Sequence, residues 1–343
     1  MNSSQKILLK TLQGEKTARV PFWFMRQAGR YLPEYRGLRA QTKSFLEFCY
    51  SPDKAKVATL QPIERFGMDG AIIFSDILVI PHALGMDVRF EEGKGPILVP
   101  VKDRNALEKL NWDKFKFTLS PVYDALRATV KTIPPETSLI GFIGAPWTLA
   151  CYVVEGKSSA DFAQVKAIAA KDREFFSDLI SLLTKAVILH AKRQIQAGAE
   201  IIQLFDSWAG VLDEQSYHRW VIDPAREIVA AIKADFNVPV IGFPRQSGSK
   251  FLTYAKETKV DVISFDDSVP IEWARDSLQP SVMVQGCLDP QILAGDKEMM
   301  LKDAQKILSI LGNKNFIFNL SHGVVPHTPV ENMQALCDFL KEQ

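Results

Sequence analysis

The chain has 343 residues, of which 47% are hydrophobic and 24% are charged, so it can bury a large core. Its formal net charge is +1, so no overall field favours binding to nucleic acid or to an anionic membrane surface. The four cysteines are widely spaced and form no CxxC pair, which argues against a disulfide framework and is typical of a reducing compartment.

The first ten residues contain no apolar region of the length that a signal peptide needs. No stretch approaches the ~18 uninterrupted apolar residues that are typical of a membrane-spanning helix. We therefore expect a cytoplasmic protein.

The first predicted element is a short buried strand at residues 20–24, which is followed by Arg26, Gln27, Gly29 and Arg30. A guanidinium group suits carboxylate or phosphate ligands because it offers two parallel donors and stays charged when it is desolvated. The segment therefore predicts a site for an anionic ligand at the end of this strand.

Two other arrangements are open for these arginines. If the chain turns helical here, Arg26 and Arg30 lie four residues apart and share one face of the helix. Alternatively, they belong to a solvated surface loop and pair with Glu34 and Glu64.

Further strands and helices alternate along the rest of the chain. Strands are predicted at residues 70–76, 139–144, 200–206, 238–242, 260–265, 282–286 and 316–320. Helices are predicted at residues 52–66, 121–132, 160–170, 172–197, 213–234, 249–258, 271–277, 297–311 and 330–341. Residues 86–101 alternate in polarity and are rich in Gly and Pro, which predicts an inserted β-hairpin.

The strand pattern indicates the fold class. Near-continuous apolar runs indicate strands that are covered on both faces, and such strands belong to parallel sheets. Eight of them, separated by helices, predict an α/β protein with a (β/α)8 TIM barrel, as a single domain over residues 1–343. A doubly wound open sheet is the alternative, although the sequence has no glycine-rich dinucleotide fingerprint.

The active site of a TIM barrel lies at the carboxyl ends of its strands. In strand order, the predicted strands end in Arg26, Gln27 and Arg30; Ser75 and Asp76; residues 145–152; Asp206, Ser207 and Trp208; Arg245; Asp266 and Asp267; Gln285 and Asp289; and Ser321 and His322. On the first, second, third and last strands, arginines and hydroxyl groups outnumber acids. This distribution predicts a ligand that carries several carboxylates.

Asp76 is an acidic residue within this basic set. An aspartate at a strand end often caps the next helix. Here the apolar residues 77–80 follow, so no helix start is expected at once. Burying a carboxylate among such neighbours is costly without a partner or a purpose, so we predict a functional role for Asp76.

Structural roles are the alternatives for the other residues. His322 could be a turn residue, Tyr152 a core residue and Ser207 a helix cap. A zinc site made of Cys287, His322 and His327 is a further alternative, but no HxC or HxxxH pair supports it. No GxSxG or P-loop motif is present, so covalent catalysis by Ser or Cys is poorly supported.

Several stretches resemble the uroporphyrinogen decarboxylase family. PFWFMRQAGRYLPEYR at residues 21–36 resembles the N-terminal signature of this family, and GFIGAPWTLACYVVEG at residues 141–156 resembles its second signature. Residues 71–78, 203–210 and 318–323 match further blocks in the expected order. Two positions depart from the family pattern: Cys287 stands where Asn is usual, and Ser321 where Gly commonly precedes the His.

The resemblance implies a homodimeric single-domain barrel that removes CO2 from the four acetate side chains of uroporphyrinogen III to give coproporphyrinogen III, without a metal or other cofactor. It implies catalytic roles for Asp76, Arg26 and Arg30. The substrate-binding residues that it implies are Arg26, Gln27, Ala28, Gly29, Arg30, Asp76, Tyr152, Ser207 and His322.

Elementary chemistry agrees with this implication. A pyrrole whose ring carbon is protonated can accept the electrons that the departing carboxylate leaves, so no cofactor has to serve as electron sink. Asp76 is suited to hold the ring N–H groups and to offset the developing positive charge. Two other functions stay open: a methyltransferase barrel with zinc held by His and Cys, and a tetrapyrrole carrier that performs no reaction.

Overall fold

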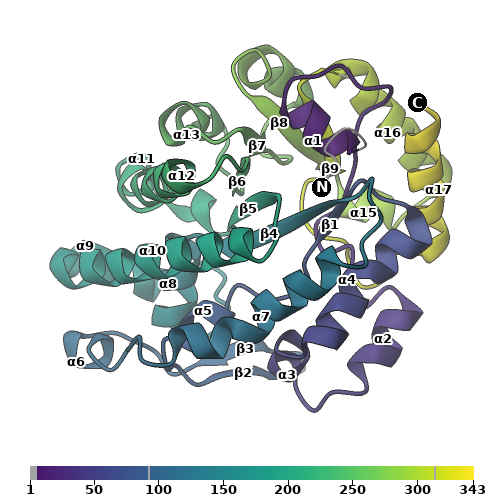
Figure 1. Ribbon diagram of the computed structural model, residues 1–343. Helices are drawn as coiled ribbons and strands as arrows, with labels where there is room; N and C mark the ends of the chain where they lie inside the picture. The colour runs from purple at the N-terminus through teal and green to yellow at the C-terminus, as the bar shows by residue number, and fades with distance from the viewer. Residues whose placement is uncertain (1–5, 92, 313) are drawn as a thin grey trace.

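Parallel strands lie at the centre of the molecule and helices surround them (Figure 1). The computed structural model describes residues 6–91, 93–312 and 314–343. Within these residues, seven parallel strands form one sheet in the order β1-β4-β5-β6-β7-β8-β9. They are β1 (Gly70–Ile72), β4 (Ser138–Gly144), β5 (Ile201–Asp206), β6 (Val240–Pro244), β7 (Val262–Ser264), β8 (Met283–Leu288) and β9 (Phe316–Leu320).

Among the described residues, the first four helices precede β1, and the other helices are interspersed with the strands. The helices are α1 (Ile7–Leu12), α2 (Pro33–Arg39), α3 (Phe45–Cys49), α4 (Pro52–Phe66), α5 (Val79–Ala83), α6 (Arg104–Leu107), α7 (Phe115–Val130), α8 (Pro146–Glu155), α9 (Ala163–Lys171), α10 (Arg173–Gln196), α11 (Glu214–Tyr217), α12 (Asp223–Asp235), α13 (Lys250–Thr258), α14 (Ile271–Trp273), α15 (Pro290–Leu293), α16 (Lys297–Leu311) and α17 (Val330–Glu342). Short 3-10 or π segments are η2 (Ala209–Val211), η3 (His218–Ile222) and η4 (Ala274–Leu278).

One helix end and one helix start show where the predictions from sequence succeeded and where they failed. The predicted end of α4 at Gly67 is confirmed, because this glycine adopts the left-handed conformation with φ 62°. The predicted start of α7 at residue 121 is wrong, since the helix begins at Phe115 and runs through Pro121. Pro121 cannot donate to the carbonyl of Phe117, and the hydroxyl of Ser120 donates to that carbonyl instead.

The predicted first strand, residues 20–24, is a single bridge between Phe22 and Phe318 rather than a regular strand. Pro21 lacks an N–H group, and the N–H of Phe22 donates to the carboxylate of Asp69, so the ladder is interrupted. The segment nevertheless lies between β9 and β1. Phe318 N donates to Pro21 O over 2.9 Å, and Asp69 N donates to Phe22 O over 3.0 Å. The sheet therefore has the strand order of a barrel, with this segment in the eighth position, and is not a doubly wound open sheet.

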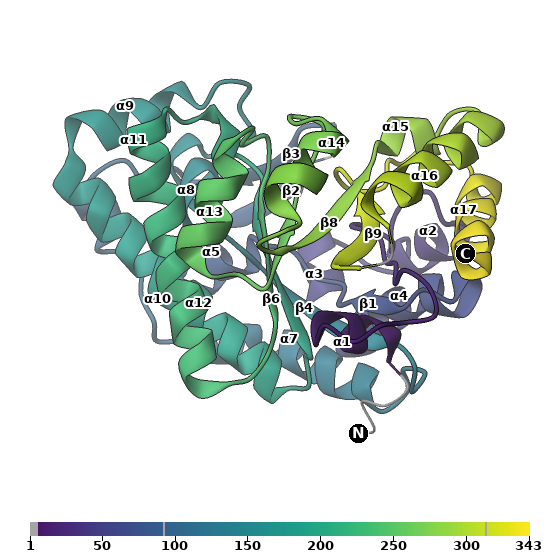
Figure 2. The same ribbon diagram turned by 90° about the horizontal axis from the view of Figure 1, so that it is seen from above.

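Apolar side chains fill the interior of the barrel that the sheet forms. The interior cluster consists of Leu8, Trp23, Met25, Ile72, Ile140, Ile201, Ile241, Phe243, Val262 and Ile317. Leu8 comes from α1, which closes the end of the barrel opposite α14 and α15 (Figure 2). The amide of Gln285 also lies inside, where it accepts from Trp23 Nε1 over 2.9 Å and donates to Ser264 Oγ over 2.6 Å. This end is packed, so we place the ligand site at the other end, where the carboxyl ends of the strands lie.

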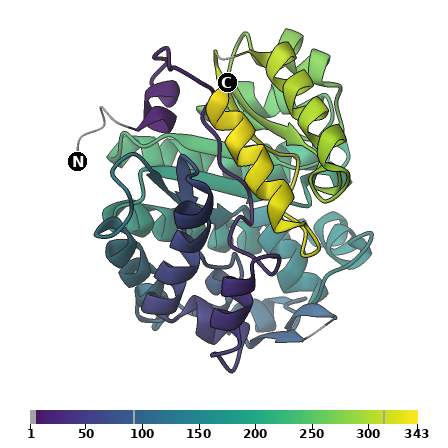
Figure 3. The same cartoon turned by 90° about the vertical axis from the view of Figure 1, so that its right-hand side faces the viewer.

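Two further elements complete the fold. Strands β2 (Val88–Glu91) and β3 (Gly95–Leu98) form an antiparallel pair within the range where the hairpin is predicted. The C-terminal helix α17, drawn in yellow, packs beside α4 (Figure 3). No helix among the described residues is long and apolar enough to cross a bilayer.

The hydroxyl of Thr59 on α4 supports the chain where it leaves β1, and we expect Thr59→Val to be destabilising. Thr59 Oγ1 accepts from Phe74 N over 2.9 Å and donates to Ala55 O, and the site is fully buried. Valine would leave the N–H of Phe74 buried without a partner, which costs about 1–3 kcal/mol of unfolding free energy. Urea unfolding measures this loss.

Thr129→Val is the matched control for this prediction. Thr129 is equally buried and also donates to the carbonyl four residues earlier, but its hydroxyl accepts no hydrogen bond from a described residue. Its replacement should cost less than Thr59→Val. Equal losses in the two variants would contradict the role given to Phe74 N–H.

Candidate active site

The predicted site residues follow the carboxyl ends of several strands, and Arg26 connects them electrostatically. Its positive charge contributes to lowering the pKa of Asp76, of Tyr152 and of His322. These residues follow β1, β4 and β9. The open end of the barrel therefore brings together residues that are far apart in the sequence.

The backbone of Arg26 turns sharply after the barrel segment. Arg26 has a φ of 60°, a left-handed conformation that is uncommon for a residue with a side chain. Its side chain lies directly on Gly323, where an added Cβ would lie 2.6 Å from Arg26 Cγ. The neighbouring main chains are joined by Val324 N, which donates to Met25 O over 2.9 Å. Gly323 thus leaves the space that holds the guanidinium group at the mouth of the barrel.

Asp76 is half-buried, and its two oxygens have different environments. Oδ1 accepts from Leu78 N over 2.8 Å, whereas Oδ2 accepts from no group of the described residues. Burial raises the pKa of Asp76 to about 6, although the hydrogen bond from Leu78 and the charge of Arg26 oppose this rise. The carboxylate therefore has one oxygen free to accept hydrogen bonds from a ligand.

The expectation that no helix follows Asp76 is wrong. Helix α5 begins at Val79, and the hydrogen bond from Leu78 N belongs to the turn that leads into it. The apolar sequence concealed this helix because α5 is buried on most of its surface. The turn accounts for Oδ1 only, so Oδ2 is still available to a ligand.

The loop after Arg26 is not helical, so the shared helix face considered for the two arginines does not form. Arg30 is exposed, and its side chain makes no hydrogen bond or ion pair with a described residue. The surface pairing considered for it is also absent from the described residues, because the partner of Glu34 is Arg65 at 3.2 Å. Arg30 is therefore free to meet a ligand.

Ala28 and Gly29 lie between the arginines and are half-buried. Their main-chain N–H groups donate to no group in the part of the chain that the structure describes. Unpaired N–H groups beside two guanidinium groups favour an anionic ligand.

Gln27 lies in a different environment from its neighbours. Its side chain is fully buried, where Oε1 accepts from Phe24 N over 3.0 Å and Nε2 donates to Gly70 O over 3.0 Å. The amide therefore ties the loop to β1. Its contact with the substrate stays a prediction that this geometry does not favour.

Tyr152, Ser207 and His322 are each half-buried. Burial raises the pKa of Tyr152 and, with the charges of Arg26 and Arg245, lowers the pKa of His322 to about 3. Both side chains are therefore neutral near pH 7. The hydroxyl of Ser207 makes no hydrogen bond with a described residue, and it caps no helix there.

Asp206 ends β5 but does not face the barrel mouth. Successive side chains of a strand point to opposite faces, and Ile201 and Phe205 pack with the interior cluster. Asp206 therefore points outward, where it is buried and its Oδ1 accepts from Thr148 Oγ1 of α8 over 2.5 Å. Its place in the predicted strand-end set is wrong, and the alternation along β5 would have revealed this.

Replacement of Asp206 by Asn should change how stability depends on pH. Burial raises the pKa of Asp206 to about 7, against an ordinary value of about 4 in the unfolded chain. Between these values the folded protein holds a proton that the unfolded chain has lost, so rising pH lowers the free energy of unfolding. Asp206→Asn lacks this dependence and should gain stability relative to the wild type from pH 5 to pH 8, as measured by urea unfolding.

Asp213→Asn is the control for this pH dependence. Hydrogen bonds from Ser216 hold the pKa of Asp213 below its usual range, so this group is ionised throughout pH 5–8. Its stability difference from the wild type should be constant over that window. The same constancy in Asp206→Asn would contradict the protonation argued for Asp206.

Sequence reasoning missed an apolar surface at the mouth. Phe142 and Phe205 pack on the interior cluster but are only partly buried, and their ring centroids lie 5.8 Å apart. They come from the inward faces of β4 and β5 near the carboxyl ends. Alternation along these two strands would have identified this aromatic pair, which offers a surface for a flat, apolar ring system.

The zinc alternative has no support in the described residues. Cys287, His322 and His327 do not gather, and no group of three or more His, Cys, Asp or Glu side chains is placed to hold a metal ion in residues 6–91, 93–312 and 314–343.

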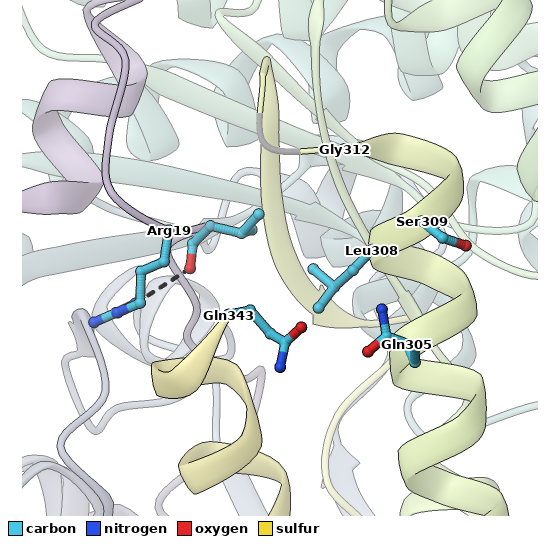
Figure 4. Close-up of a pocket in the computed structure, with 7 residues that line it drawn as sticks. Arg19, Gln305, Leu308, Ser309, Gly312 and Gln343 are labelled. Atoms are coloured by element: carbon cyan, nitrogen blue, oxygen red, sulfur yellow. Dashed lines mark hydrogen bonds between the residues drawn. The ribbon is translucent and has the colours of Figure 1, made fainter.

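A cavity of about 300 Å³ lies away from the site, between the segment at Arg19, α16 and the end of α17 (Figure 4). The guanidinium group of Arg19 is bound to Asp69 at 2.7 Å and to Val20 O at 3.2 Å, so it is not free for a ligand. This cavity contains none of the predicted site residues.

Comparisons with known proteins place this chain in a family. The model of the family described as uroporphyrinogen decarboxylase (URO-D) matches residues 3–343. A uroporphyrinogen decarboxylase of Rhodospirillum rubrum is 46% identical over 99% of this chain and 98% of its own length. One from Mesorhizobium japonicum is 46% identical over 96% of each chain.

A solved structure supports the fold alone. A methyltransferase from Methanosarcina mazei has a TM-score of 0.74 and covers 98% of this chain and 97% of its own, at 16% identity. The family model and the close relatives cover nearly the whole sequence, including each of the strand ends described above. The chain therefore belongs to the uroporphyrinogen decarboxylase family.

Proposed function

We propose that this chain is a carboxy-lyase that converts uroporphyrinogen III to coproporphyrinogen III by removing CO2 from its four acetate side chains. One observation carries the proposal beyond family membership. A half-buried carboxylate, Asp76, keeps one oxygen free and lies close enough to Arg26 for that charge to lower its pKa, and the exposed Arg30 follows four residues after Arg26. This arrangement suits a ligand with N–H donors at its centre and carboxylates around its rim.

Each decarboxylation can use the substrate as its own electron acceptor. A proton adds to the ring carbon next to the one that bears the acetate, which places a positive charge that the ring nitrogen and the acetate-bearing carbon share. The bond between the acetate CH2 and its carboxylate then breaks, CO2 leaves, and the electron pair neutralises the ring as an exocyclic double bond. Addition of a proton to the CH2 and loss of the proton from the ring carbon give the methyl group, so one proton is consumed for each CO2.

Asp76 contributes by its charge and its position. In this proposal Oδ2 accepts hydrogen bonds from the pyrrole N–H groups. The carboxylate stabilises the positive charge that develops when the pyrrole ring is protonated. A fixed charge in a site with little water is effective because it needs no reorganisation during the reaction. The pKa of about 6 leaves most of the carboxylate ionised at pH 7.

The residues around Asp76 hold the rest of the macrocycle in this proposal. Arg26, Arg30 and the free N–H groups of Ala28 and Gly29 bind carboxylates at the rim. Neutral Tyr152, Ser207 and His322 offer hydrogen bonds without adding charge. A homodimer and a cytoplasmic location stay predictions that the family resemblance supports.

The test is incubation of the purified chain with uroporphyrinogen III under anaerobic, reducing conditions. Release of CO2 and the appearance of coproporphyrinogen III, analysed after oxidation to the porphyrin, is the expected result. Recovery of unchanged uroporphyrinogen together with tight binding would identify a carrier instead and would overturn the proposal.

A further inference from the structure

We propose that Arg245 is a third guanidinium group of the substrate site, binding a carboxylate on the side of the barrel mouth opposite Arg26 and Arg30. This inference rests on the proposed function, because it takes the substrate to be a macrocycle with carboxylates around its rim.

The position of Arg245 follows from the sheet order. Starting from the segment at residues 20–24, the order is β1, β4, β5 and then β6, so β6 lies four positions away in either direction. Ile241 and Phe243 of β6 face the barrel interior. Arg245 continues this inward alternation directly after the strand ends.

The main chain of Arg245 is hydrogen-bonded to the end of β5 and to η2. Its N–H donates to Asp206 O over 3.0 Å, and its carbonyl accepts from Gly210 N over 3.0 Å. A side chain on such a fixed backbone loses less conformational freedom when it binds a ligand.

The guanidinium group of Arg245 has no protein partner in the described residues. Its Nε is fully buried and makes no hydrogen bond, and no ion pair joins the residue to a described carboxylate. The nearby acids are engaged elsewhere: Asp206 accepts from Thr148, and Asp266 accepts from the N–H groups of Gln246 and Ser268. A buried donor without a partner is costly, which favours an anionic ligand at this position.

The charge of Arg245 acts on His322, on another side of the barrel mouth. Together with burial and with Arg26, it lowers the pKa of His322, which follows β9. Arg245 and Arg26 therefore approach the same ligand space from opposite strands. Carboxylates on different pyrrole rings can then be bound at two sides, which fixes the rotation of the macrocycle over Asp76.

The experiment is steady-state kinetics of Arg245→Gln with uroporphyrinogen III, alongside Arg245→Lys. Loss of a charge-assisted hydrogen bond should raise KM about 10- to 100-fold, with kcat for bound substrate changed far less. Lysine keeps the charge and should restore most of the affinity. Arg127→Gln, which changes an exposed arginine on α7, is the control and should match the wild type.

An equilibrium measurement separates this inference from the proposed function. Titration with uroporphyrin, followed by quenching of tryptophan fluorescence, should give a Kd for Arg245→Gln that is about 10- to 100-fold weaker than for the wild type. A Kd and KM within twofold of the wild type would overturn the role of Arg245. So would a loss that Arg245→Lys does not restore. A wild type that binds uroporphyrin but releases no CO2 from uroporphyrinogen III would overturn the proposed function. The titration would still decide for or against the role of Arg245.

Discussion

Asp76→Asn is expected to leave the fold intact and to lower kcat for uroporphyrinogen III by about 10²–10³-fold. Asparagine keeps the oxygen that accepts from Leu78 N, so the turn into α5 is preserved. It removes the negative charge that offsets the developing ring cation, and its amide can place a donor where Oδ2 accepts. Measurement of kcat with matched circular dichroism spectra tests this result.

Asp87→Asn is the matched control for the change at Asp76. Asp87 is an exposed carboxylate shortly after α5, with Arg89 at 3.4 Å, and its replacement should leave kcat near the wild-type value. A kcat for Asp76→Asn within threefold of the wild type would remove the proposed role of this carboxylate.

The pH dependence of the wild type offers a second check on Asp76. Its raised pKa of about 6 means that the carboxylate gains a proton as the pH falls through that value. The proposed reaction needs the ionised form, so kcat/KM should decline on the acid side below about pH 6. An acid limb that begins only near pH 4 would show that burial does not raise this pKa.

Sequence pattern alone predicted most of the sheet because its strands are locally encoded. Runs such as 139–144 and 316–320 are apolar, are bounded by turn residues and appear as β4 and β9. The strand at residues 20–24 failed for a non-local reason. The N–H of Phe22 and that of Met25, the residue just after this segment, donate to the side chains of Asp69 and Asn319, and no local pattern reveals such partners.

The candidate site was predicted less evenly than the fold. Asp76 and Arg26 were predicted because charged residues directly after an apolar strand are unusual, and in the structure the charge of Arg26 lowers the pKa of Asp76. Gln27 has a similar local signal, since it is also a polar residue directly after an apolar segment, but its amide is hydrogen-bonded to the main chain of Phe24 and Gly70. These hydrogen bonds depend on how the loop folds onto β1. Asp206 has this signal too and faces outward, since the face of a strand residue is set by alternation and not by its distance from the strand end.

Gly323→Ala is expected to lower kcat/KM by about 10²-fold, because it displaces Arg26 without changing any charged residue. A Cβ at residue 323 would overlap Cδ of Arg26 and lie 2.6 Å from its Cγ. These atoms are in the middle of the side chain, so the guanidinium group must rotate away from the mouth. Gly323 does not have a positive φ, so alanine is compatible with the backbone and the protein should still fold.

The displacement of Arg26 should also be visible in the pH profile, which distinguishes it from a general loss of structure. The charge of Arg26 lowers the pKa of Asp76, so moving it away should raise this pKa and shift the acid limb of kcat/KM to higher pH. Gly37→Ala is the control, since an added Cβ there meets no atom within 4 Å and the residue lies on exposed α2. Gly323→Ala could instead lose activity while the acid limb of its kcat/KM profile stays at the wild-type pH. That result would show that the contact between Gly323 and Arg26 does not hold the charge of Arg26 beside Asp76.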